Sequence, residues 1–317
     1  MILNRRHLRI KVLQALYAFY QSDNEDVLKG EKELLHSVNK IYDLYLTYLS
    51  LFPEIKHLAE LRIEEAKEKR LPTEEDLDPS LRFVRNEVLK FYSVNQQLKS
   101  ECELRKISWT GDQELPRKTF RAIRESDAYE QYLGESQSNE LATDKAFMEK
   151  MFREHIANSE LLLQKLDEDS IYWGDDIDLV CNMVIRHLNT IQEGWTESDK
   201  LFRLFKDPKE DRDFIVRLFR QTIKSDTVTE EMIDGRAENW ELDRIALMDR
   251  LLMKMAITEA REFPSIPVKV SLNEYIEISK FYSTPKSNSF INGILDRVFL
   301  EMKQKGDMKK TGRGLIE

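Results

Sequence analysis

The sequence predicts an all-α fold, and two observations support that prediction. Glycine and proline are scarce, with 10 and 8 among 317 residues, whereas sheet-rich folds usually need more turn residues. Apolar side chains also recur at the three- and four-residue spacing that lines one face of an amphipathic helix. With 41% hydrophobic and 34% charged residues, the chain is long enough to bury one large core or two smaller ones.

The first helix is predicted over residues 4–20, NRRHLRIKVLQALYAFY, with Asn4 as a suitable N-cap. Its apolar stripe comprises Leu8, Val12, Ala15, Leu16 and Phe19. This stretch contains no acidic residue, although the whole chain carries 58 acidic against 49 basic residues and a net charge of -9. Free helix amides beside arginines favour phosphate binding. An ordinary solvated N-terminus is the alternative explanation.

The long middle region carries further helical patterns and no internal repeat. One apolar stripe comprises Leu34, Val38, Ile41, Tyr45 and Tyr48. A charged helix ends near Pro72. Further helices are predicted over about 80–107, 117–133, 143–168 and 175–193.

The last third of the chain has a tighter helical pattern. Helices are predicted over 211–225, 240–262, 271–282 and 287–304. The segment SIPVKVSL alternates like a strand, but a lone strand without a partner is not stable. Ser271 and Glu274 instead match the S-x-x-E capping box, so the third of these helices is predicted to begin at Ser271.

Patterns that would support catalysis or metal binding are mostly missing. The chain has neither a GxxxxGK[ST] loop nor a GxGxxG fingerprint, and its five histidines lack ligand spacing. Cys102 and Cys181 lie far apart without a CxxC pair. Asp175, Asp176 and Asp178 could hold magnesium, but acids that stabilise a helix start explain them better. We therefore expect no enzyme activity, no cofactor and no metal site.

Apolar runs and the N-terminal segment bear on location. No run approaches the roughly 20 apolar residues that cross a bilayer. The start MILNRRHLRI lacks the apolar core and cleavage site of a signal peptide. We therefore expect a cytoplasmic protein with no membrane partner.

Four motifs follow one another near the C-terminus: WELDRIALMDR, IPVKV, LNEYIEISK and FINGILD. Near the N-terminus, RRHLRIKVLQALYAF combines an arginine-rich opening with a Q-A-L-Y helix. In order and spacing these motifs resemble the NusB family of transcription antitermination factors. The resemblance covers about residues 1–23 and 211–304. It implies a NusB-like helical bundle with a large inserted helical module.

The resemblance divides the chain into four expected segments. Residues 1–23 would form the first bundle helix, 24–208 an inserted helical module of unknown role, 209–305 the rest of the bundle, and 306–317 a flexible basic tail. The alternative is that helices of the insertion complete the bundle core, with residues 31–52 the best candidates.

The resemblance also implies partners and contact residues. The protein would bind boxA-like single-stranded RNA together with the ribosomal protein NusE, and so act indirectly on the RNA polymerase antitermination complex of ribosomal RNA operons. The implied RNA contacts are Arg5, Arg6, Arg9, Lys11, Lys280, Tyr282, Lys286, Ser287 and Phe290. The implied NusE contacts are Tyr17, Asp243 and Asp249.

Chemistry supports these assignments and leaves alternatives open. Lysines suit phosphates, and Tyr282 and Phe290 could stack on splayed bases. Phe290 could instead begin the core stripe of the last helix, and the NusE candidates could lie on an ordinary solvated face. The competing function, from a different class, is a helical protein-interaction scaffold derived from a NusB-like domain without RNA binding.

Overall fold

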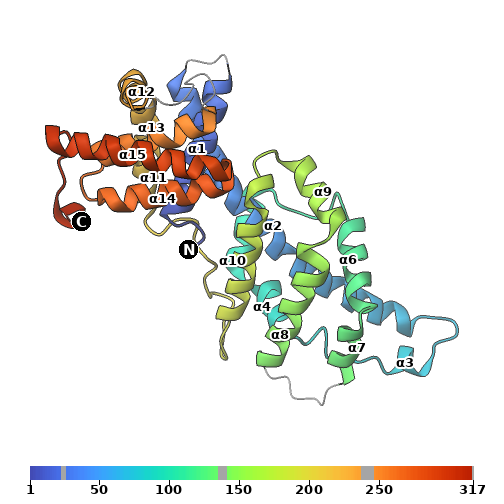
Figure 1. The fold of residues 1–317 in the computed structure, drawn as a ribbon. Coiled ribbons are helices and arrows are strands. Elements are labelled where there is room, and N and C mark those ends of the chain that lie inside the picture. Colours follow the sequence, from blue (N-terminus) through green and yellow to red (C-terminus); the bar gives the residue numbers. More distant parts are fainter. Residues whose placement is uncertain (23–25, 135–140, 237–245, 316–317) are drawn as a thin grey trace. The chain divides into compact units, whose positions relative to one another are not determined.

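The structure is a computed structural model that describes residues 1–22, 26–134, 141–236 and 246–315. Every regular element in these ranges is helical, which confirms the predicted class (Figure 1). The chain forms two compact units. The terminal unit comprises Met1, Leu3–Val38 and Leu204–Glu317, and the central unit comprises Ile2 and Asn39–Arg203.

The terminal unit is a bundle of helices drawn from both ends of the sequence. Its elements are α1 (Arg5–Gln21), the beginning of α2 (Val27–Lys67), α11 (Pro208–Lys224), α12 (Asp226–Asp234), α13 (Leu247–Glu262), α14 (Val268–Tyr282), α15 (Pro285–Lys305) and a 3₁₀ helix (Gly312–Leu315). Helix α13 is the centre of this bundle, since it packs against α1, α11, α12, α14 and α15.

Helix α13 is buried at every position from Leu251 to Ala260. A helix that is buried all round must satisfy its polar side chains inside the protein. Lys254 does so with Asp226 and Glu230, each at 2.6 Å. The other buried charge of this helix, Glu259, takes its partners from α1 and α14 and belongs to the site described below.

Helix α1 begins as the sequence predicts. The Asn4 side chain accepts from the His7 backbone N–H at 3.0 Å, and His7 Nδ1 accepts from the Asn4 N–H at 3.3 Å. This reciprocal cap satisfies two of the amides that a helix start leaves free. Leu8, Val12 and Leu16 of the predicted stripe are buried.

Helix α14 begins one turn earlier than predicted, at Val268, with Pro267 at the N-cap. The predicted start at Ser271 is therefore wrong, and so is the capping box. Ser271 is buried and donates its hydroxyl to Glu259 on α13 at 2.7 Å. Glu274 pairs with Arg6 on α1. Both side chains serve contacts between helices instead of a cap.

The chain after α15 contacts the connection between α13 and α14. Helix α15 ends at Gly306, whose φ of +76° gives the left-handed C-cap that glycine adopts without strain. Further on, the Thr311 N–H donates to the Pro264 carbonyl at 3.0 Å, and Lys310 Nζ donates to the Phe263 carbonyl at 3.1 Å. The flexible basic tail expected over 306–317 includes the residues that make these contacts, and 316–317 lie outside the described residues.

The central unit has a different set of elements. They are the rest of α2, α3 (Glu74–Leu77), α4 (Glu87–Val94), α5 (Gln96–Arg105), α6 (Glu114–Arg124), α7 (Asp127–Gly134), α8 (Leu141–Met151), a π-helical turn (Phe152–Ala157), α9 (Glu160–Asp169), a 3₁₀ turn (Gly174–Asp176) and α10 (Ile177–Thr190). Asn95 divides the single helix predicted over 80–107, since it ends α4 and caps α5.

The central unit buries a core of its own. Phe52 stacks on Tyr92 with ring centroids 4.8 Å apart, and Phe152 packs against Phe52 at 6.1 Å. The buried Asp144 carboxylate accepts from the Glu87 N–H and from the Tyr132 hydroxyl, both at 2.7 Å. Buried polar groups that are satisfied in this way fix the packing of the helices around them.

The two units divide at 38/39, within α2, and at 203/204. These positions differ from the expected limits of the insertion at 24 and 208. Leu34 and Val38 lie in the terminal unit, whereas the rest of the same apolar stripe lies in the central unit. No helix within the described ranges combines the length and apolar content that a membrane span needs.

Candidate nucleic-acid interface

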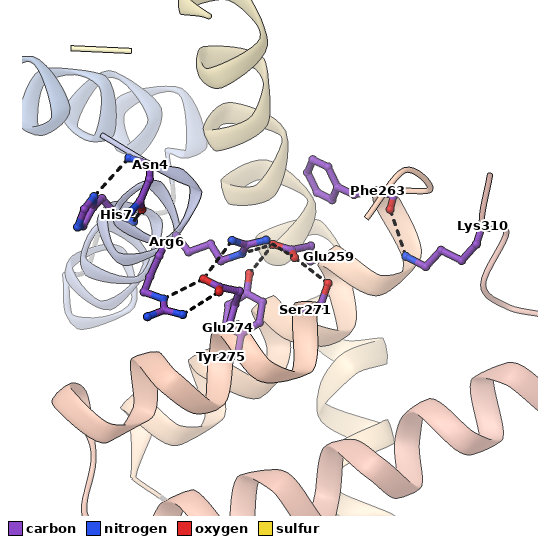
Figure 2. Close-up of polar contacts among 10 residues, drawn as sticks. Asn4, Arg6, His7, Glu259, Phe263, Ser271, Glu274, Tyr275 and Lys310 are labelled. Carbon is purple, nitrogen blue, oxygen red and sulfur yellow. Dashed lines mark hydrogen bonds and ion pairs between the residues drawn. The ribbon is translucent and has the colours of Figure 1, made fainter. Parts of the chain in front are cut away.

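The arginine-rich start of α1 is tied to α13 by a buried ion pair. Arg9 donates to both carboxylate oxygens of Glu259, each at 2.8 Å. Glu259 also accepts from the hydroxyls of Ser271 at 2.7 Å and Tyr275 at 3.1 Å (Figure 2). Burial alone would lower the pKa of Arg9, but the Glu259 carboxylate outweighs it and holds that pKa above its ordinary value.

The expectation that Arg9 and Lys11 contact RNA is therefore corrected, because both side chains are buried. Only 2% of Arg9 and 3% of Lys11 is exposed. Helix α1 is an interior helix over this stretch, so its basic residues do not form a single solvent-facing strip. Arg9 stabilises the junction of α1, α13 and α14 and faces its carboxylate partner instead of the solvent.

Arg6 lies at the surface edge of the same network. Its guanidinium makes a two-pronged pair with Glu274 on α14, with distances of 3.0 Å and 2.8 Å (Figure 2). The hydrogen bond from Arg6 lowers the pKa of Glu274 and holds this carboxylate ionised. The Arg6 side chain is still 39% exposed, so a phosphate can reach it without unfolding of the bundle.

Arg5 points toward α11. Its guanidinium pairs with Glu210 at 2.5 Å and Asp211 at 3.4 Å, and lies over the Phe214 ring at 4.4 Å from the centroid. Its Nη1 is buried and has no hydrogen-bond partner among the described residues.

These side chains line one cleft of about 1110 Å³ in the terminal unit, here called the arginine cleft. Helix α1 contributes Asn4, Arg5, Arg6 and Arg9; α11 contributes Glu210, Asp213, Phe214 and Arg217; the segment from Phe263 to Glu274 and Arg313 complete it. Five arginines and three acids line the cleft, and Asp211, Glu259 and Glu262 pair with three of these arginines from outside the lining. Salt screens exposed charges over roughly 8–10 Å, which lets such a local patch act by itself.

The second predicted RNA segment lies along the same pair of helices. Tyr282 at the end of α14 accepts from Gln14 of α1 at 3.2 Å, eight residues beyond the Arg6–Glu274 pair on both helices. Eight helical residues span about 12 Å. The arginine cleft and the α14–α15 turn therefore lie about 12 Å apart along helices α1 and α14.

The remaining residues of this segment have different environments. Lys280 is exposed and pairs with Glu277, and Lys286 is exposed in the first turn of α15. Ser287 lies in the same turn, where its N–H is capped by Thr284. Phe290 is half-buried, so both expected roles stay open.

Three further residues of this region are absent from the sequence predictions. Phe281 is 78% exposed beside Tyr282, and Arg217 and Arg313 line the arginine cleft. Arg313 lies beyond the motifs, and only the folded chain brings it near Arg5.

The two predicted NusE contacts within the described residues have different environments. Tyr17 is 39% exposed, as a docking residue would be. Asp249 is only 5% exposed and accepts from the Ser283 hydroxyl, so it ties α13 to the α14–α15 turn and does not present an acidic surface. Asp243 lies outside the described residues.

The aspartates considered above as a magnesium site lie at the start of α10. Asp176 is the N-cap residue of α10 and Asp178 lies in its first turn. Within the described ranges, no group of three or more histidine, cysteine or acidic residues is arranged to hold a metal ion.

The sequence matches a family of known proteins. The profile described as NusB family matches residues 178–299. The transcription antitermination protein NusB of Salinibacter ruber is 49% identical over 113 residues, which cover 36% of this chain and 70% of the relative. The chain belongs to the NusB family.

Two other relatives with the same name agree with this family assignment. The NusB protein of Chloroherpeton thalassium is 45% identical over 106 residues, 33% of this chain and 50% of the relative. That of Koribacter versatilis is 38% identical over 98 residues, 31% of this chain and 67% of the relative. No solved structure matches the chain.

Family membership has two direct consequences. Homology to NusB implies a role in the antitermination machinery. NusB family antitermination factors are non-enzymatic, which agrees with the prediction that this chain is not an enzyme. The family match begins within α10, upstream of the predicted residue 211, and it does not include α1.

Proposed function

We propose that this NusB family member binds boxA-like single-stranded RNA in the arginine cleft and along the α14–α15 turn. The observation that carries the proposal is the pairing of α1 with α14, which aligns Arg6 and Tyr282 on the same two helices. Arginines at one end suit phosphates, and the exposed Phe281 with the half-buried Tyr282 at the other end suits unstacked bases. The protein would act in the cytoplasm, on nascent RNA of ribosomal RNA operons.

The ion pairs of the cleft are compatible with RNA binding. Arg5 and Arg6 hold carboxylates that are themselves solvent-accessible, with Glu210 73% and Glu274 22% exposed in their side chains. Exposed ion pairs contribute about 0–1 kcal/mol each, so a phosphate can compete for the guanidinium. The carboxylates also hold both arginines in place before RNA arrives, which reduces the entropy lost on binding.

The test is a binding assay with a boxA-like RNA, a scrambled RNA of equal length, and two charge-reversed variants. Arg5→Glu/Arg6→Glu should lose most of the affinity. The matched control Arg117→Glu/Arg121→Glu makes the same charge change at exposed positions of α6 in the central unit and should bind as the wild type does. Equal affinity of both variants for boxA-like RNA would remove the cleft from the proposal and favour the scaffold function.

We further propose that NusE docks on the surface that holds Tyr17. Tyr17→Asp adds a charge at a position that is already exposed, so it should weaken association more than folding. A pull-down against NusE and a thermal melt of the same variant separate these effects. A variant that melts normally and still binds NusE fully would show that the surface lies elsewhere.

A further inference from the structure

The segment after α15 is held against the terminal unit by contacts that need specific residues. Besides the bonds of Lys310 and Thr311 to the α13–α14 connection, Gly314 is buried against it. A Cβ atom at Gly314 would lie 1.9 Å from the Pro264 carbonyl oxygen. Real side chains cannot approach so closely, so this close approach requires glycine. Burial in the same contact lowers the pKa of Lys310.

The docked segment brings Arg313 to the arginine cleft. The other four cleft arginines all have carboxylate partners: Arg5 with Glu210, Arg6 with Glu274, Arg9 with Glu259 and Arg217 with Glu262. Arg313 is exposed and has no ion pair or hydrogen bond to any described residue. Among the described residues it is therefore the cleft arginine without a carboxylate partner.

The wall beside Arg313 combines aromatic and cationic groups. Phe214 and Phe263 meet edge to face at 5.1 Å, and the Arg217 guanidinium lies over the Phe263 ring at 5.1 Å. The cleft is as large as the upper end of small-molecule sites, which are about 300–1,000 Å³. It therefore has room for a nucleotide with its phosphate beside an unpaired guanidinium.

We propose that the C-terminal segment around Arg313 completes the RNA site, with Arg313 contacting a backbone phosphate opposite Arg5 and Arg6. The inference rests on the proposed function and deepens it. The segment lies beyond residues 178–299, so the family match does not supply it. RNA phosphate is the occupant that the charge favours, because a guanidinium without a carboxylate pairs best with a phosphate oxyanion.

The experiment uses the full-length protein and measures the affinity for boxA-like RNA over a range of salt. Arg313→Gln should bind about tenfold more weakly, the usual effect of losing one charged hydrogen bond. Its log-log salt dependence should be shallower by about 0.7, the value for one phosphate contact on a single strand. Arg313→Lys should recover part of both losses. Arg297→Gln, an exposed arginine of α15 outside the cleft lining, is the matched control and should behave as wild type.

A second variant tests the docking itself. Gly314→Val cannot keep its contact with Pro264, so it should release Arg313 from the cleft and weaken RNA binding as Arg313→Gln does, with a melting curve close to that of the wild type. Unchanged affinity and salt dependence in Arg313→Gln, with binding still lost in Arg5→Glu/Arg6→Glu, would overturn this inference alone. If the charge-reversed pair also binds normally, the proposed function fails with it.

Discussion

Arg6 and Arg9 are one turn apart in α1 and have different roles. Arg9 is enclosed with Glu259, and both members of this pair are almost fully buried. Arg6 is partly exposed and its partner Glu274 is accessible from solvent. Sequence alone gives both the same chemistry, because a basic motif does not show which of its members faces the core. The positions of α13 and α14 are needed to tell the roles of these two arginines apart.

Arg9→Met should destabilise the terminal unit strongly. Removing one partner of a buried ion pair leaves an uncompensated charge at Glu259 and costs about 3–5 kcal/mol. Arg6→Met should cost less than about 1 kcal/mol, since its pair is partly exposed, but should weaken RNA binding. Urea unfolding of both variants, beside RNA titrations, measures the contrast. Equal stability of the two variants would contradict the structural role of Arg9.

His187 makes the central unit sensitive to acid. It is 2% exposed, bonded to the Tyr92 hydroxyl at 2.7 Å, and surrounded by aromatic rings. Burial lowers its pKa from the ordinary 6.5 to about 4. Between these pH values the unfolded chain binds a proton that the folded unit does not, so stability is full above pH 6.5 and falls as the pH drops toward 4.

The free energy of unfolding should therefore decrease by about 3 kcal/mol over that pH range on account of His187, at 1.36 kcal/mol per pKa unit. His187→Gln keeps a hydrogen-bonding side chain and removes the titration. Urea unfolding followed by the fluorescence of Trp109, Trp173 and Trp195 in the central unit measures both proteins from pH 7.5 to 4.5. An identical pH dependence of the two proteins would show that His187 is not the group responsible.

At the scale of elements, local sequence patterns predicted well where helices form. They predicted poorly which contacts individual side chains of those helices make. The cap at Asn4 and the helical state of the FINGILD motif were predictable, because spacing and capping chemistry are local. The start of α14 was not, because Ser271 and Glu274 fit a capping box by sequence while their side chains bond to α13 and α1. The docking of Arg313 depends on contacts between distant segments, which no local pattern contains.

The start of α15 offers an element-scale test. Thr284 caps this helix by accepting from the Ser287 N–H. Thr284→Ala should cost about 1 kcal/mol and should loosen the turn that carries Tyr282 and Lys286, with a moderate loss of RNA affinity. Thr110→Ala, at an exposed position of the central unit, is the control. RNA binding that is unaffected by Thr284→Ala would argue against a role for this turn.

At the scale of the whole molecule, two units with separate cores share the 41-residue helix α2. The residues proposed to bind RNA lie in the terminal unit, and we propose that the central unit serves interaction or stability. A chain that joins 1–38 to 204–317 through a flexible linker should remain helical, unfold cooperatively and keep most of the RNA affinity. Residues 39–203 alone should fold without binding RNA. Aggregation of the joined chain, or loss of its RNA binding, would contradict this division.

The salt dependence of RNA binding tests the central claim most directly. The candidates that are at least partly exposed, Arg5, Arg6, Lys280, Lys286 and Arg313, would make four or five phosphate contacts, for a log-log slope of about -3 at about -0.7 per contact on a single strand. Arg5→Glu/Arg6→Glu should bind weakly with a markedly shallower slope. A wild-type slope near zero, or the same slope in the charge-reversed variant, would contradict an RNA site in the arginine cleft.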